Sequence, residues 1–108
     1  MSKEITRSAL AEALLSEAPP IVLEALGRNY HASGHIPTAR ALPLEELASL
    51  APELVPYKDR AIVVYCASTT CRNSHQAADW LRGRGYRNVA VYPGGKKDWA
   101  EAGLRLEV

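Results

Sequence analysis

Short apolar runs alternate along the chain with segments whose apolar residues recur every three or four positions. The most marked run is Ala-Ile-Val-Val-Tyr at 61–65, which is apolar at every position. A strand with no polar face is typical of a parallel sheet that is covered on both sides. Shorter apolar runs predict further strands at 21–23, 39–42 and 88–92.

The first helix is predicted over 3–17, where the apolar residues follow a helical period. Ser2 or Lys3 stands at the position of an N-cap, and the proline pair 19–20 stops the helix. A turn or short helix is predicted at 27–34, between two glycines.

Three more helices are predicted further along the chain. The first begins at Pro43, a residue that suits the first turn, and runs to about Leu50. A loop bracketed by Pro52 and Pro56 follows it. The other two helices, over 72–84 and 96–102, are each closed by glycine.

Strands that alternate with helices predict an α/β fold, in which a central, mostly parallel sheet is flanked by helices on both faces. The length of 108 residues suits a single domain over 1–108. We expect an N-terminal helix at about 3–17 and a core at about 21–108.

The net charge and the hydropathy of the chain argue against nucleic-acid and membrane partners. Thirteen Lys and Arg residues against twelve Asp and Glu residues give a formal net charge of +1, which lacks the basic footprint of a nucleic-acid-binding protein. No run approaches the roughly 18 apolar residues of a membrane span, and the start lacks the apolar stretch of a secretory signal. We expect a soluble cytoplasmic protein with neither a nucleic-acid nor a membrane partner.

The strand at 61–65 delivers Cys66 at its carboxyl end, and a polar loop then leads into a helix. Ligands of open α/β sheets bind beyond the carboxyl ends of the strands, and the amides of a helix N-terminus attract negative charge. The same field favours thiolate, so we expect a lowered pKa and a catalytic, nucleophilic Cys66. The alternative is a buried cysteine that acts as a small apolar side chain. The candidate site loop is Ala67, Ser68, Thr69, Thr70, Cys71 and Arg72.

Several short motifs follow one another in a fixed order along the chain. They are Gly-His-Ile-Pro at 34–37, Val-Val-Tyr-Cys at 63–66, the alanine pair 77–78, Gly-Tyr at 85–86, and Gly-Gly at 94–95 ahead of Trp99 and Gly103. Together they resemble the rhodanese-like (sulfurtransferase) domain family from about 21 to 108. The resemblance implies a five-stranded sheet and an activity similar to that of thiosulfate sulfurtransferases. Cys66 would take a sulfane sulfur from a small anion such as thiosulfate and pass it, as a persulfide, to a thiol or cyanide acceptor without a cofactor.

The loop after Cys66 is longer than in the family pattern, since the alanine pair begins eleven positions after the cysteine. The Cys66-x5-Arg72 spacing resembles the phosphate-binding loop of Cdc25-type phosphatases and the arsenate reductases related to them. In that alternative, Arg72 clamps a tetrahedral oxyanion in bidentate fashion. Asp98 and Glu101 are candidate general acids for such a reaction.

Four further residues depart from the family pattern or invite a second interpretation. Glu24 stands near the acid position of a pair that usually follows the first strand, and Leu26 stands near the arginine position. Lys96 and Lys97 begin the last predicted helix, where cations oppose the helix dipole. They either bind an anionic substrate or form a solvated surface pair.

Cys71 lies in the same loop and is a candidate resolving thiol. It could attack a persulfide on Cys66 and release the product as a disulfide; the alternative is a buried helix-start residue with no chemical role. A structural zinc site needs four ligands, which two cysteines and scattered histidines do not provide, so we expect no metal. The resemblance implies that His35 belongs to a structural turn, with its imidazole bonded to the backbone.

Overall fold

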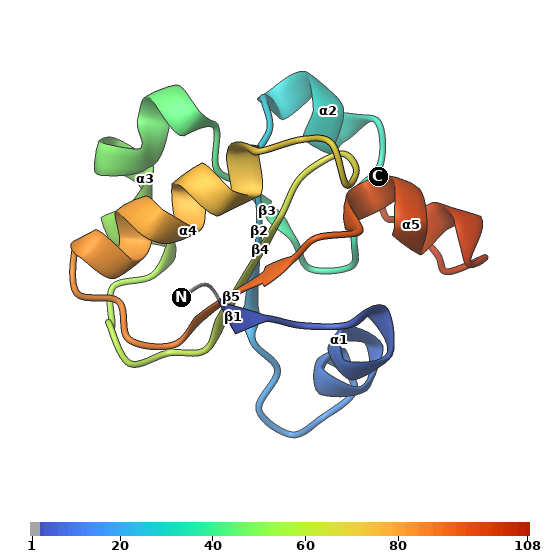
Figure 1. Ribbon diagram of the computed structural model, residues 1–108, viewed down its shortest axis with the longest axis horizontal. Helices are drawn as coiled ribbons and strands as arrows, with labels where there is room; N and C mark the ends of the chain where they lie inside the picture. Colours follow the sequence, from blue (N-terminus) through green and yellow to red (C-terminus); the bar gives the residue numbers. More distant parts are fainter. Residues whose placement is uncertain (1–2) are drawn as a thin grey trace.

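The fold is built on a five-stranded sheet in which every pair of neighbouring strands is parallel (Figure 1). The computed structural model describes residues 3–108. The predicted α/β class, with a mostly parallel five-stranded sheet, is confirmed. The strands are β1 (Lys3–Glu4), β2 (Ile21–Glu24), β3 (Arg40–Ala41), β4 (Ile62–Tyr65) and β5 (Val89–Tyr92), in the spatial order β1-β5-β4-β2-β3.

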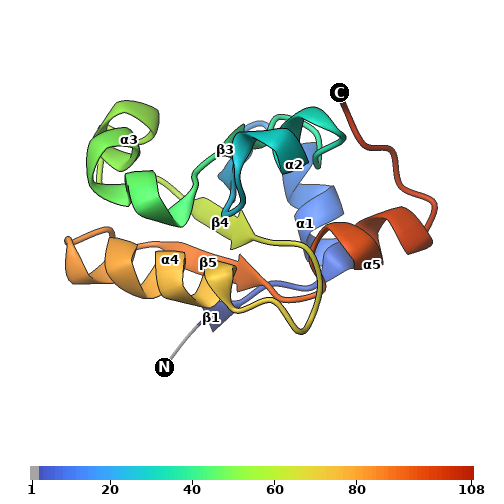
Figure 2. The same ribbon diagram turned by 90° about the horizontal axis from the view of Figure 1, so that it is seen from above.

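Helices cover both faces of the sheet (Figure 2). On one side lie α3 (Leu47–Leu54) and α4 (Asn73–Gly83), and on the other lie α1 (Arg7–Leu14) and α5 (Gly95–Glu101). The short α2 (Arg28–Ala32) has no buried residue, and a 3-10 turn at Leu44–Glu46 leads into α3. Within residues 3–108, no helix is long and apolar enough to cross a membrane.

The central strand β4 explains the two-sided core. Ile62 and Val64 pack into the cluster that includes α3 and α4, whereas Val63 and Tyr65 pack into the cluster that includes α1 and α5. Successive side chains of a strand point to opposite faces, so a strand covered on both sides must be apolar throughout. All four side chains of β4 are therefore buried, and Cys66 follows directly at the carboxyl end of the strand.

The N-terminal segment differs from the prediction. Residues 3–4 form β1, which pairs with β5, and the helix begins only after them. Thr6 is the N-cap, with its Oγ1 accepting a hydrogen bond from the Ala9 amide at 3.1 Å. The expected cap at Lys3 is therefore wrong, and Ser2 lies outside the described residues. Helical periodicity hides so short a strand, because its hydrogen-bonding partner is remote in the sequence.

The third helix is also longer than predicted. It continues through Pro52 instead of ending near Leu50, so the expected loop between Pro52 and Pro56 is wrong in its first half. Proline has no amide hydrogen and leaves one helical bond unmade. The Val55 amide still donates to the Ala51 carbonyl at 2.8 Å and closes the last turn. Ala51 is fully buried, and this packing outweighs the local preference of proline.

A glycine at the start of α5 lets that helix press against the backbone of the cysteine loop. Gly95 has φ +69°, and a Cβ built there would lie 2.5 Å from the Cys66 carbonyl oxygen. The close approach allows the Lys96 amide to donate to the Cys66 carbonyl and the Lys97 amide to the Ala67 carbonyl, each at 2.9 Å. The position of Cys66 therefore depends on α5 as well as on β4.

We predict that Gly95→Ala destabilises the protein far more than Gly103→Ala. Gly103 also has a positive φ, +81°, but a Cβ there would meet nothing within 4 Å. The control should lose about 1–2 kcal/mol from backbone strain alone, and Gly95→Ala about 4 kcal/mol or more because a backbone carbonyl must move. Urea unfolding of both variants measures the difference, and equal losses would contradict the contact with Cys66.

Candidate active site

Cys66 is nearly closed off from solvent, with 2% of its surface exposed. Its Sγ donates to the Cys71 carbonyl oxygen at 3.2 Å and lies within hydrogen-bond distance, 3.4 Å, of the Ser74 hydroxyl. Ser74 is itself buried, in the first turn of α4. The thiol thus faces the N-terminal end of α4, where backbone amides lack helical partners.

The loop after Cys66 turns back on itself before α4 begins. The Cys71 amide donates to the Ser68 carbonyl at 3.1 Å, and the Ser68 and Thr70 hydroxyls lie 3.1 Å apart and bond to each other. Thr69 and Thr70 are exposed at the tip. Arg72 is exposed at the N-cap of α4, and its side chain makes no hydrogen bond or ion pair within residues 3–108.

The two thiols experience different electrostatic environments. Burial raises the pKa of Cys66, and a hydrogen bond between the two thiols raises it further, although the Ser74 hydroxyl and amide oppose this. Burial also favours a higher pKa for Cys71, but hydrogen bonds to its sulfur outweigh this effect. The hydrogen bond with Cys66 and the backbone amides of Ala67 and Asn73 lower the pKa of Cys71. The expected lowering of the Cys66 pKa is therefore wrong for this conformation, because desolvation exceeds the helix field and Cys71 receives the first negative charge.

We predict that a brief, limiting treatment with iodoacetamide at neutral pH modifies Cys71 before Cys66. Only the thiolate is a good nucleophile, so a raised pKa keeps Cys66 protonated until the solution becomes more alkaline. Peptide mass mapping over a pH series gives the two rates, and unfolded protein, in which both thiols are exposed, is the control. Preferential labelling of Cys66 at neutral pH would contradict the assigned directions.

A buried carboxylate lies beside Cys66 in the sheet. Glu24, at the end of β2, is fully buried and in register with Tyr65. The Tyr65 hydroxyl donates to Glu24 Oε2 at 2.6 Å and accepts from the Ile36 amide at 3.0 Å. Burial and the bond to Glu24 raise the pKa of Tyr65, so its hydroxyl stays a neutral donor. This network joins β2, β4 and the segment that contains Ile36.

Lys96 supplies the cation for this buried carboxylate. Its Nζ lies 3.2 Å from Glu24 Oε2 and donates to the Tyr30 carbonyl at 2.7 Å. Lys96 is therefore neither a solvated surface residue nor free for a substrate. Glu24 Oε1 has no hydrogen-bond partner among the described residues. Sequence reasoning missed this pair because a lysine at the start of a helix gives no sign of a partner far away in the chain.

We predict that Lys96→Met destabilises the protein by about 3–5 kcal/mol at neutral pH, the loss typical of a buried charge left alone. Lys97→Met is the matched control, because Lys97 is exposed, and its effect should stay within about 0.5 kcal/mol. Denaturant unfolding of both variants measures the difference, and equal losses in the two would count against the ion pair of Lys96 with Glu24.

His35 lies in a turn that closes the other side of the fold. Its Nδ1 donates to the His31 carbonyl at 2.9 Å, and its ring stacks on the His31 ring with centroids 3.7 Å apart. The His35 backbone pairs with Glu107 through two 2.8 Å bonds. These contacts turn the imidazole toward the backbone and the C-terminal segment.

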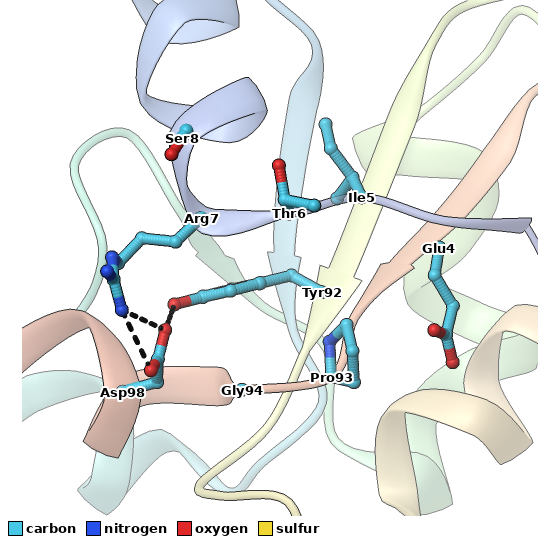
Figure 3. Close-up of a pocket in the computed structure, with 9 residues that line it drawn as sticks. All are labelled: Glu4, Ile5, Thr6, Arg7, Ser8, Tyr92, Pro93, Gly94 and Asp98. Carbon is cyan, nitrogen blue, oxygen red and sulfur yellow. Dashed lines mark hydrogen bonds and ion pairs between the residues drawn. The ribbon is translucent and has the colours of Figure 1, made fainter.

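A cleft of about 380 Å³ lies between the start of α1 and the end of β5, with Asp98 in its wall (Figure 3). Asp98 accepts hydrogen bonds from the Tyr92 hydroxyl and from Arg7 Nη1, the latter at 3.0 and 3.1 Å. The Tyr92 bond first, and Arg7 next, hold the pKa of Asp98 below its usual value. A carboxyl that remains ionised is a poor general acid, which argues against that role for Asp98.

A smaller cleft of about 140 Å³ adjoins the cysteine loop. Ser68 and Thr69 form one wall, and the other residues are Gly94, Lys97, Asp98 and Glu101. Within residues 3–108, no three His, Cys, Asp or Glu side chains gather in a way that could hold a metal ion. The charged residues of this cleft are the exposed Lys97 and the two acidic residues Asp98 and Glu101.

Ser74 is the site residue that sequence reasoning passed over. It follows Cys66 by eight positions and lies in the first turn of α4, where its hydroxyl and amide both bond Cys66 Sγ. A hydroxyl residue in the first turn of a helix that follows a candidate nucleophile is the signal that could have identified it.

Several solved structures share this fold. The Alr3790 protein of Anabaena is 30% identical, and the match covers 95% of this chain and 79% of that chain with a TM-score of 0.84. A thiosulfate sulfurtransferase from Pseudomonas aeruginosa is 25% identical over 98% of this chain and 20% of its own, with a TM-score of 0.83. A human single-domain sulfurtransferase is 23% identical over 94% of this chain and 97% of its own, with a TM-score of 0.79, and shows the fold alone.

No match is found among curated protein sequences. The family model described as "Rhodanese-like domain" matches residues 8–102, which is most of the chain. The chain therefore belongs to the rhodanese-like domain family, as the motif order predicts.

Proposed function

We propose that the protein is a sulfurtransferase that carries a sulfane sulfur on Cys66. The observation that carries the proposal is the setting of Cys66 Sγ, at the end of β4 and within hydrogen-bond reach of the Ser74 hydroxyl and amide. Donors at that place stabilise negative charge on sulfur. Family membership and relatives that include sulfurtransferases support the same function.

Loading begins with a small anionic donor such as thiosulfate. The Cys66 thiolate attacks the outer sulfur of thiosulfate, a new sulfur–sulfur bond forms, and sulfite leaves with the electron pair of the broken bond. In the small cleft beside the loop, the exposed Lys97 is the cation that such an anion would meet, next to Asp98 and Glu101. Because burial raises the pKa of Cys66, the loading rate should increase with pH above the usual thiol value of about 8.5.

Unloading transfers the outer sulfur to an acceptor. A thiolate or cyanide attacks the outer sulfur of the Cys66 persulfide, and the Cys66 thiolate leaves. The Ser74 hydroxyl and amide stabilise this leaving thiolate, since both lie within hydrogen-bond reach of the sulfur. The cycle needs neither a cofactor nor a metal, because the sulfur atom itself carries the oxidation state.

The alternative function is an oxyanion enzyme of the phosphatase or arsenate reductase kind. The spacing from Cys66 to Arg72 favours it, and Arg72 is exposed at the start of α4. Against it, Asp98 is held as an ionised carboxylate. Sulfur transfer needs no general acid for an alkoxide leaving group, so we favour it.

We predict that Cys66→Ser lowers thiocyanate formation from thiosulfate and cyanide by at least about 10³-fold, as loss of a nucleophile does. Arg72→Ala should retain most of the wild-type rate. Folding of both variants is checked by circular dichroism. Sulfur transfer that survives in Cys66→Ser overturns the proposal, whereas phosphatase or arsenate turnover that disappears in Arg72→Ala, without any sulfur transfer by the wild type, favours the alternative.

A further inference from the structure

The protein holds a second thiol against the first. Cys66 Sγ donates to the Cys71 carbonyl at 3.2 Å, and each of the two thiols shifts the pKa of the other. Both cysteines are free. Transfer of sulfur to an external acceptor uses only Cys66, so the cycle above leaves this contact without a role.

We propose that Cys71 attacks the inner sulfur of a Cys66 persulfide and releases the outer sulfur as hydrosulfide, leaving a Cys66–Cys71 disulfide. This inference rests on the proposed function, because Cys66 must first accept a sulfur. It adds a second activity: the protein would reduce sulfane sulfur to sulfide with its own thiol pair. A dithiol reductant would then restore the two thiols.

The step balances without an outside oxidant. The Cys71 thiol gives its proton to the terminal sulfur of the persulfide, and its own sulfur forms a bond to Cys66 Sγ. The bond between Cys66 Sγ and the terminal sulfur breaks, and hydrosulfide leaves with the electron pair. The terminal sulfur is reduced to the level of sulfide, and the two cysteine sulfurs are oxidised to the disulfide. A reducing dithiol later supplies the two electrons that reopen it.

The surroundings of the two sulfurs favour attack at the inner one. Thiol–disulfide exchange proceeds faster when the departing sulfur is the weaker base. Attack on the outer sulfur would expel the thiolate of Cys66, whose pKa is raised by burial, while attack on the inner sulfur expels hydrosulfide. The geometry agrees, because the backbone carbonyl of Cys71 lies 3.2 Å from Cys66 Sγ, the atom that becomes the inner sulfur of the persulfide.

The loop makes Cys71 the better nucleophile of the two thiols, and it also leaves Cys71 accessible to a reductant. The amides of Ala67 and Asn73 donate to its sulfur and favour the thiolate. Cys71 is half-buried, next to the exposed tip residues Thr69 and Thr70, whereas Cys66 is 2% exposed. A dithiol would therefore open the disulfide at the sulfur of Cys71.

The test loads the full chain with thiosulfate in the absence of thiol or cyanide and then removes the donor. Sulfide is trapped with a bimane reagent, and intact mass identifies the protein species. We expect the wild type to release one equivalent of sulfide and to lose the mass of two hydrogens. Cys71→Ser should keep one extra sulfur atom and release none, and Cys71→Ala should behave in the same way. Dithiothreitol added afterwards should return the wild type to its starting mass.

The outcomes separate the two proposals. A wild type that keeps its persulfide as stably as Cys71→Ser, or equal sulfide release by both, overturns this step and leaves the sulfurtransferase function standing. A lack of sulfur uptake by Cys71→Ser and by the wild type, with Cys66 shown to be a free thiol, overturns the sulfurtransferase function and this step with it. Because the retained persulfide itself reports a working loop, loss of folding in one variant cannot imitate the expected result.

Discussion

The fully buried Glu24 carboxylate is the constraint on which the arrangement around Cys66 depends. A charge in that position is tolerated only where it is paired and hydrogen-bonded. Tyr65 and Lys96 meet this requirement from β4 and α5. The same lysine offers its backbone amide to the Cys66 carbonyl, so the ion pair and the position of the cysteine are mechanically linked.

The pair of thiols illustrates how position within one loop divides chemical character. Cys66 and Cys71 share a hydrogen bond and the amides of the same helix start, yet their pKa values move in opposite directions. The difference comes from burial, which penalises charge on Cys66 more than the local dipoles favour it. Two identical side chains can therefore have different proposed roles: Cys66 carries the sulfur, and Cys71 attacks the persulfide that forms on Cys66.

Much of the fold could be predicted, because β4 is apolar on both faces and the strand–loop–helix order around Cys66 is local information. The two-residue β1 was not predictable, since it exists only through pairing with β5. The continuation of α3 through Pro52 depends on packing that no local pattern shows. At the site, the cysteine could be located, but its raised pKa and the partnership of Lys96 with Glu24 depend on three-dimensional burial.

The two outermost strands have a consequence for association between copies of the chain. Both β1 and β3 are only two residues long, and exposed charged side chains (Lys3 and Glu4 on one edge, Arg40 on the other) mark them. Short, charged edges offer few unpaired backbone groups to an incoming strand. The sheet is thereby protected against growth by edge-to-edge addition, although its interior strands are as apolar as those that aggregate when exposed.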